Sequence, residues 1–107
     1  MAIDIHVEDH SEEFLAELRR RIPVALEECG LAAEGYAKRL CPVDTGRLRN
    51  SITHTADEDT AYVGTNVEYA PYVEMGTSRT RAQPFIKPAV MDHTREYKQI
   101  IESRLNG

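Results

Sequence analysis

Asp44, Thr45 and Gly46 form the triplet in this chain that could do chemistry most directly. In aspartic proteases two such triplets face each other, and their aspartates share a proton and activate a water molecule. Those sites lie among apolar strands, whereas here a predicted helix and Cys41-Pro42-Val43 precede the triplet and Arg47 follows it. A match of three residues is weak by itself. The triplet instead predicts a turn, capped by Asp44, that reverses the chain.

Histidines and cysteines do not form a ligand pattern. The four histidines are scattered at His6, His10, His54 and His93. Cys29 and Cys41 would lie about 18 Å apart on one helix, which is too far for a disulfide bond, so we predict that both are small buried side chains. The sequence therefore predicts no catalytic residue, no metal site and no cofactor.

Composition limits the class of protein. The chain has 107 residues, 41% hydrophobic and 29% charged, with a formal net charge of −5. This length suits one domain and excludes a large multi-substrate enzyme. No apolar run approaches the roughly 20 residues that a membrane-spanning helix needs. The acidic N-terminal residues are unlike a signal peptide, so we expect a protein of the cytosol.

The elements expected around the triplet begin with a short strand over residues 3–8, where apolar and polar residues alternate. Ser11 then marks the start of a helix, whose apolar stripe repeats with helical spacing as far as Leu40. Pro23 lies within this stripe, which stays in register on both sides of it, so we predict one long bent helix.

The second half of the chain predicts a hairpin and a terminal helix. Residues 51–55 and 60–64 are rich in β-branched side chains and flank a polar turn. Residues 67–73 are expected to be a strand end that leads into a turn or a short helix. Residues 76–84 are expected to form an exposed, mobile loop, which Phe85 and Ile86 anchor at its far end. Pro88 is placed as the first residue of a final helix. We therefore expect an α+β domain over residues 1–107: a small, mainly antiparallel sheet packed against the long bent helix, with a C-terminal helix.

Charge is distributed unevenly along the chain. Residues 1–17 carry six acidic side chains and no Lys or Arg, whereas residues 76–89 carry Arg79, Arg81 and Lys87 and no acid. Such complementary segments favour self-association, in which the basic loop of one copy meets the acidic face of the next. A solvated loop without a partner is the alternative that charge alone leaves open.

Three ordered segments carry a more specific pattern. They are CPVDTGRLRNSI at residues 41–52, VGTNVEYAPYVEMGT at residues 63–77 and QPFIKPAV at residues 83–90. With the helices before and after them, they cover nearly the whole chain. This pattern resembles the small tail-component or neck protein family of long-tailed double-stranded DNA phages and prophages.

The resemblance implies a non-enzymatic structural virion protein of the head–tail joining (neck) or tail-completion region. It implies self-assembly into a ring through head-to-tail contacts, for which a hexamer is one arrangement, with neighbouring neck and tail proteins as further partners. Neither a membrane nor a specific DNA sequence is expected as a partner, although DNA would pass through the lumen of the ring. The expected location is the host cytoplasm during assembly and the mature virion afterwards.

The predicted interface, turn and packing residues lie within the segments that carry the resemblance or next to them. Arg79 and Arg81, with Lys87, are the predicted subunit interface, and Asp44, Thr45 and Gly46 are the predicted structural turn. Tyr69, Tyr72, Val73 and Met75 are expected to pack the linking segment onto the core. The alternative hypothesis is a free-standing cytosolic binding module, a small dimer acting on nucleic acid, whose affinity would depend on salt. The acidic total and the lack of a basic helix oppose a dedicated DNA reader.

Overall fold

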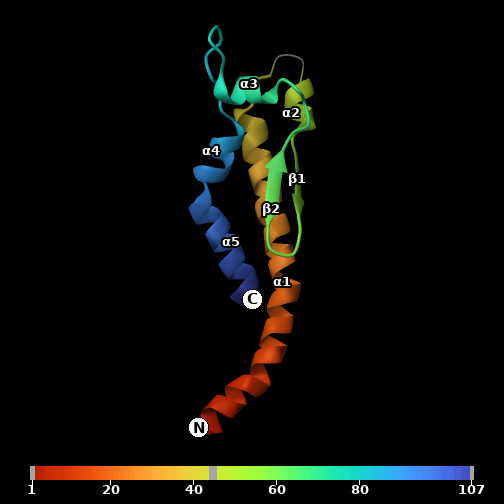
Figure 1. Cartoon of the computed structure of the whole chain (residues 1–107), viewed down its shortest axis with the longest axis vertical. Coiled ribbons are helices and arrows are strands. Elements are labelled where there is room, and N and C mark those ends of the chain that lie inside the picture. Colours follow the sequence, from red (N-terminus) through yellow and green to blue (C-terminus); the bar gives the residue numbers. More distant parts are fainter. Residues whose placement is uncertain (1, 44–45, 107) are drawn as a thin grey trace.

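The computed structural model describes residues 2–43 and 46–106, with side chains from residue 12 onward. The molecule is elongated, measuring 68 × 20 × 20 Å. A long helix runs along it, and the other elements gather around the C-terminal part of that helix (Figure 1). The elements are α1 (Ala2–Leu40), α2 (Arg47–Ser51), β1 (Thr53–Ala56), β2 (Ala61–Gly64), α3 (Ala70–Met75), α4 (Ile86–Met91) and α5 (Thr94–Asn106).

Helix α1 confirms the long helix but overturns the strand expected before it. The helix begins at Ala2 rather than at Ser11 and continues through Pro23 to Leu40. A lone strand at residues 3–8 would need a neighbouring strand, and the sheet of the described residues contains only β1 and β2. The helix instead satisfies its backbone hydrogen bonds within the segment itself. The N-terminal part of α1 curves away from the body (Figure 1).

The predicted hairpin is confirmed. β1 and β2 are antiparallel, with Thr53 opposite Gly64 and His54 opposite Val63. The carboxylate of Asp57 closes the turn, because its Oδ1 accepts the backbone N–H groups of Asp59 at 3.1 Å and Thr60 at 2.9 Å. These hydrogen bonds to the charged form lower the pKa of Asp57. The hairpin lies along α1, which gives the two-stranded sheet one covered face.

The core lies where α1 meets the other elements, towards the end opposite the N-terminus. It is formed by Ala37, Cys41, Leu48, Ile52, Val67, Ala70, Phe85 and Ala89. Phe85 is completely buried and anchors the chain after the 76–84 loop, as the sequence predicts. Cys29 and Cys41 are buried free thiols, and burial raises the pKa of each.

The C-terminal region contains two helices where one was predicted. α4 ends at Met91 and α5 begins at Thr94, so the chain changes direction between them. Pro88 is the third residue of α4 rather than the first residue of a single helix. The Tyr97 hydroxyl of α5 donates a hydrogen bond of 2.5 Å to the Ala89 carbonyl oxygen of α4, which holds the two helices together. Desolvation, the main cause, raises the pKa of Tyr97 to about 12.

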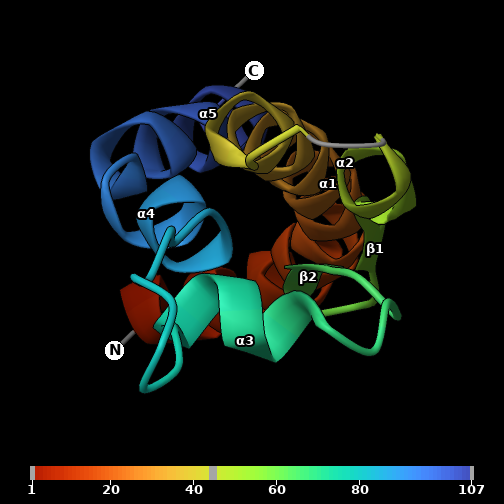
Figure 2. The ribbon, with the colours of Figure 1, turned by 90° about the horizontal axis from the view of Figure 1, so that it is seen from above.

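Two aromatic side chains fix the α4–α5 junction to α1. The rings of Tyr36 and His93 stack with their centroids 3.5 Å apart and their planes within 2° of parallel. The Tyr36 hydroxyl also donates to the Glu96 carboxylate, which is the main cause of the raised pKa of Tyr36. Viewed along the long axis, α4 and α5 lie on one side, α2 and the hairpin on the other, and α3 crosses between them (Figure 2).

The expected α+β class is confirmed, because a two-stranded antiparallel sheet packs against the long helix and a helix ends the described chain.

Candidate functional site

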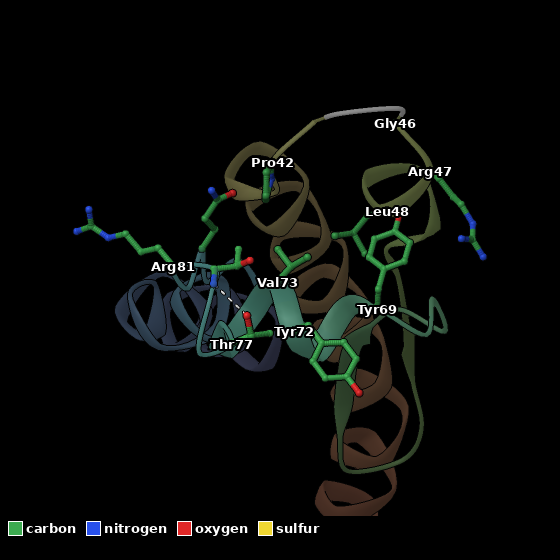
Figure 3. Close-up of a pocket in the computed structure, with 11 residues that line it drawn as sticks. Pro42, Gly46, Arg47, Leu48, Tyr69, Tyr72, Val73, Thr77 and Arg81 are labelled. Atoms are coloured by element: carbon green, nitrogen blue, oxygen red, sulfur yellow. Dashed lines mark hydrogen bonds between the residues drawn. The ribbon is translucent and has the colours of Figure 1, made fainter.

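A groove opens at the end of the molecule formed by α2, α3, the segment after α1 and the loop (Figure 3). We call it the end groove. Its volume is about 610 Å³, and it is lined by Pro42, Gly46, Arg47, Leu48, Tyr69, Tyr72, Val73, Thr77, Thr80, Arg81 and Gln83. Leu48 is buried and Val73 packs against the core, whereas Tyr72 is 62% exposed. The groove therefore combines apolar and aromatic surface with the guanidinium groups of Arg47 and Arg81.

Glu74 closes the base of the loop that borders the groove. Its Oε1 accepts the backbone N–H groups of Phe85 at 3.1 Å and Ile86 at 2.9 Å, and its Oε2 accepts that of Lys87 at 3.1 Å. These are the N–H groups at the start of α4, which have no partner within the helix. One carboxylate on α3 therefore caps α4 and holds the two ends of the 76–84 loop together.

The loop has a defined path of its own. Gly76 has a φ of 76°, and a Cβ there would lie 2.7 Å from the Ala82 backbone nitrogen and 2.9 Å from the Thr80 carbonyl oxygen. The Thr77 Oγ1 accepts the backbone N–H of Thr80 at 3.0 Å, and the Gln83 N–H donates to the Val73 carbonyl oxygen at 2.8 Å. Residues 77–84 are all exposed, as predicted. Hydrogen bonds within the loop and to α3 thus support an exposed segment.

The three basic residues of the predicted interface occupy different positions. Arg81 lines the end groove. Arg79 is exposed in the Thr77–Thr80 turn, and the exposed Lys87 lies on α4 outside the groove lining. Within the described part of the chain, no acidic side chain forms an ion pair with any of these three. Their charges are therefore directed at solvent in the single chain.

Of the predicted turn residues, Gly46 lies across the groove from Arg81 (Figure 3). Asp44 and Thr45 lie outside the described residues, so the turn itself stays a prediction. Gly46 lines the groove and has a φ of 83°, in the left-handed region that favours glycine, immediately before α2. Arg47 then makes two hydrogen bonds to the Glu68 carboxylate, at 3.1 and 3.2 Å. The Arg47 guanidinium also lies 5.4 Å from the centre of the Tyr69 ring.

The expected packing of the linking segment is correct for only half of its residues. Tyr69 and Val73 pack against the core, but Tyr72 is 62% and Met75 73% exposed. The short α3 can turn only one side towards the core, so the residues on its other side face solvent. This exposed apolar surface lies next to the basic loop, a combination typical of surfaces that contact other proteins.

His54 holds the hairpin to α1 and was missed by the sequence interpretation. Its Nδ1 lies 2.9 Å from Oε1 of Glu34, and its Nε2 lies 2.6 Å from Oε1 of Glu27. The hydrogen bond with Glu34, and then that with Glu27, raises the pKa of His54. The same contact with His54 is the main cause of the lowered pKa of Glu34. Glu27, Gly30 and Glu34 follow helical spacing, so they share one face of α1. This spacing is the sequence signal that could have predicted a residue packed between two carboxylates.

The described residues contain no group of three or more His, Cys, Asp or Glu side chains that could hold a metal ion. Among the same residues, no helix has the length and apolar character to cross a bilayer. What the end groove offers is two tyrosines, two threonine hydroxyls, an amide and guanidinium groups on an apolar base. Such groups bind another molecule by stacking, hydrogen bonds and charge.

Comparison with known proteins gives one family match. A family model described as "Bacteriophage HK97-gp10, putative tail-component" matches residues 6–76. The matched region contains most of α1 together with α2, the hairpin and α3, and it ends where the loop begins. No match was found among curated proteins or solved structures.

Proposed function

Because the chain belongs to the HK97-gp10-like family of phage tail components, we propose that it is a non-enzymatic structural subunit of a phage neck or tail-completion region. In this function it assembles with copies of itself into a ring, of which a hexamer is one arrangement, and contacts neighbouring neck and tail proteins. The observation that carries the proposal is the exposed basic loop held beside the end groove by Glu74.

A held loop favours association. A flexible segment loses conformational entropy when it binds. The internal hydrogen bonds of residues 76–84 already order the loop in the free chain, so less entropy is lost on binding. Arg79, Arg81 and Lys87 are all exposed, and none of them has an acidic ion-pair partner among the described residues. Charged groups of this kind guide partners into register during assembly.

The net charge of −5 suits a ring through which DNA passes. DNA is itself strongly negative, so a protein surface that neutralises few phosphates does not retain it. With the basic residues buried in contacts between subunits, the surface left for the lumen is more acidic still. The proposed location is the host cytoplasm during assembly and the neck or tail of the finished virion.

The proposal is tested on particles of the phage that encodes the chain. Quantitative mass spectrometry of purified particles is expected to find several copies of the wild-type chain per tail. Arg79→Glu with Arg81→Glu is expected to lower that number at least tenfold. Arg95→Glu with Lys98→Glu, which changes two exposed residues of α5 by the same charge, is expected to leave it unchanged. Particles that lack the wild-type chain would contradict the proposal.

A further inference from the structure

We propose that the end groove of one copy receives residues 12–18 of α1 from a second copy. We call this segment the α1 arm. The inference rests on the proposed self-assembly and assigns its two contacting surfaces, which the family match leaves open. The occupant is a second copy of this chain, rather than a different protein or a nucleic acid.

The α1 arm carries an apolar face that the rest of the described structure leaves uncovered. Phe14 is 62% and Leu15 47% exposed. Both continue the stripe whose later members, including Cys29 and Ala33, are buried beneath α5 and the hairpin. The C-terminal end of α5 meets α1 at Arg21, whose Nη1 donates to the Leu105 carbonyl oxygen at 3.0 Å. The stripe thus continues towards the N-terminus beyond this contact with α5.

The end groove has the shape and chemistry to take such a face. Its volume of about 610 Å³ lies within the roughly 300–1,000 Å³ of pockets that bind compact apolar ligands. Leu48, Tyr69 and Val73 supply apolar and aromatic surface, and the exposed Tyr72 can close over an inserted ring. Insertion of an amphipathic helix into an apolar groove is a common form of protein recognition.

Charge complementarity indicates that the inserted helix belongs to a second copy of this chain. Glu12 and Glu13 are exposed beside Phe14, and residues 1–17 contain no Lys or Arg. Arg81 lines the groove and Arg79 is exposed in the neighbouring turn. With Phe14 in the groove, Glu12 and Glu13 can pair with Arg79 and Arg81 of the other copy, so the apolar and ionic contacts reinforce one another.

The positions of the two surfaces make the contact intermolecular and directional. The arm and the groove lie towards opposite ends of a 68 Å molecule (Figure 1), so one chain cannot make the contact with itself. Different surfaces on successive copies form a head-to-tail interface, which closes into a ring when each copy is rotated relative to the last. The N-terminal part of α1 is curved (Figure 1), and in this arrangement the curvature would tilt one copy relative to the next.

Disulfide trapping tests the contact. Phe14→Cys and Tyr72→Cys are purified separately, mixed and oxidised gently, and the mixture is expected to give a covalent dimer of one copy of each. The matched control mixes Phe14→Cys with Tyr62→Cys, because Tyr62 is 53% exposed on the hairpin and outside the groove. The wild type is a second control, since its two cysteines are buried. A dimer no more abundant with Tyr72→Cys than with Tyr62→Cys would overturn the proposal.

Light scattering separates this inference from the proposed function. Phe14→Glu is expected to raise the concentration at which half of the protein is associated by about tenfold or more, whereas Leu31→Glu, at another exposed position of α1, leaves it unchanged. Glu12→Arg with Glu13→Arg weakens association, and Arg79→Glu with Arg81→Glu on the other copy restores it. Oligomers that persist in Phe14→Glu refute the arm as the contact and leave self-assembly standing. A wild type that never associates refutes both.

Discussion

Gly30 of α1 and His54 of β1 are in contact so close that a side chain at Gly30 would displace the imidazole. A Cβ at Gly30 would lie 2.8 Å from Cδ2 and 3.3 Å from Cβ of His54. The missing side chain therefore lets the hairpin approach the helix and brings both ring nitrogens of His54 to carboxylates of Glu27 and Glu34.

Gly30→Ala is expected to destabilise the protein by about 1–3 kcal/mol, because His54 must move off its carboxylate partners. Gly35→Ala is the matched control on the same helix, since a Cβ there meets nothing within 4 Å. The control is expected to stabilise by up to about 1 kcal/mol, because alanine favours helix over glycine. Urea denaturation measures both free energies of unfolding, and the same sign for the two variants would contradict the packing described for His54.

The contribution of His54 to stability depends on pH. Its pKa in the folded protein is raised above the ordinary value of 6.5, so its contribution is fully present below pH 6.5 and is lost as the pH rises through the folded pKa. The pKa of Glu34 is lowered from 4.5, so its contribution is lost at the acidic end. The His54–Glu34 pair is therefore strongest between about pH 5 and 6.5.

His54→Gln is expected to cost about 1 kcal/mol at pH 6 and measurably less at pH 9. Free energies of unfolding of the wild type and the variant across this range isolate His54 from the other titrating groups. A cost that does not change with pH would show that the charged form of His54 has no special interaction in the folded protein.

Glu74→Ala is expected to destabilise by about 0.5–2 kcal/mol, the cost of losing a side-chain cap at a helix N-terminus. Hydrogen exchange is the sharper measurement, because the amides of Phe85, Ile86 and Lys87 should lose protection together. Glu74→Gln should retain part of the protection of these amides, since its side-chain carbonyl oxygen still accepts a hydrogen bond. Glu58→Ala, at an exposed position in the hairpin turn, controls for loss of charge. Unchanged exchange at the three amides would refute the capping role.

Gly76→Ala is expected to destabilise by about 1–3 kcal/mol, because the positive φ and two close backbone neighbours leave no room for a methyl group. Thermal denaturation with Gly64→Ala as the comparison measures this effect, since a Cβ at Gly64 meets nothing within 4 Å. A variant as stable as Gly64→Ala would mean that the loop takes another path.

The sequence is sufficient to predict the long helix, the hairpin and a helical C-terminus, because each depends on a local periodicity. The apolar stripe identifies α1 across Pro23, and β-branched residues identify the strands. It also indicates that Phe85 anchors the loop. These features follow from which side chains are apolar and must be buried, and they do not depend on how the elements pack against one another.

The remaining features depend on contacts distant in the sequence. The alternation at residues 3–8 resembles a strand, but the helix extends through it because a strand there would lack a neighbour to pair with. The roles of Glu74 and His54 rest on partners 11 and 20 residues away, respectively. The exposure of Tyr72 and Met75 depends on how α3 is oriented against the core. Composition and spacing do not determine such relationships.

Self-assembly through the basic loop can be measured by light scattering across a wide concentration range, which gives the mass of the assembled species. We expect the 12.1 kDa chain to form a species of several copies whose mass stops increasing with concentration. Arg79→Glu with Arg81→Glu is expected to abolish this species, whereas Arg95→Glu with Lys98→Glu retains it. A monomer at every concentration, or an assembly that Arg79→Glu with Arg81→Glu leaves intact, would refute assembly through the basic loop.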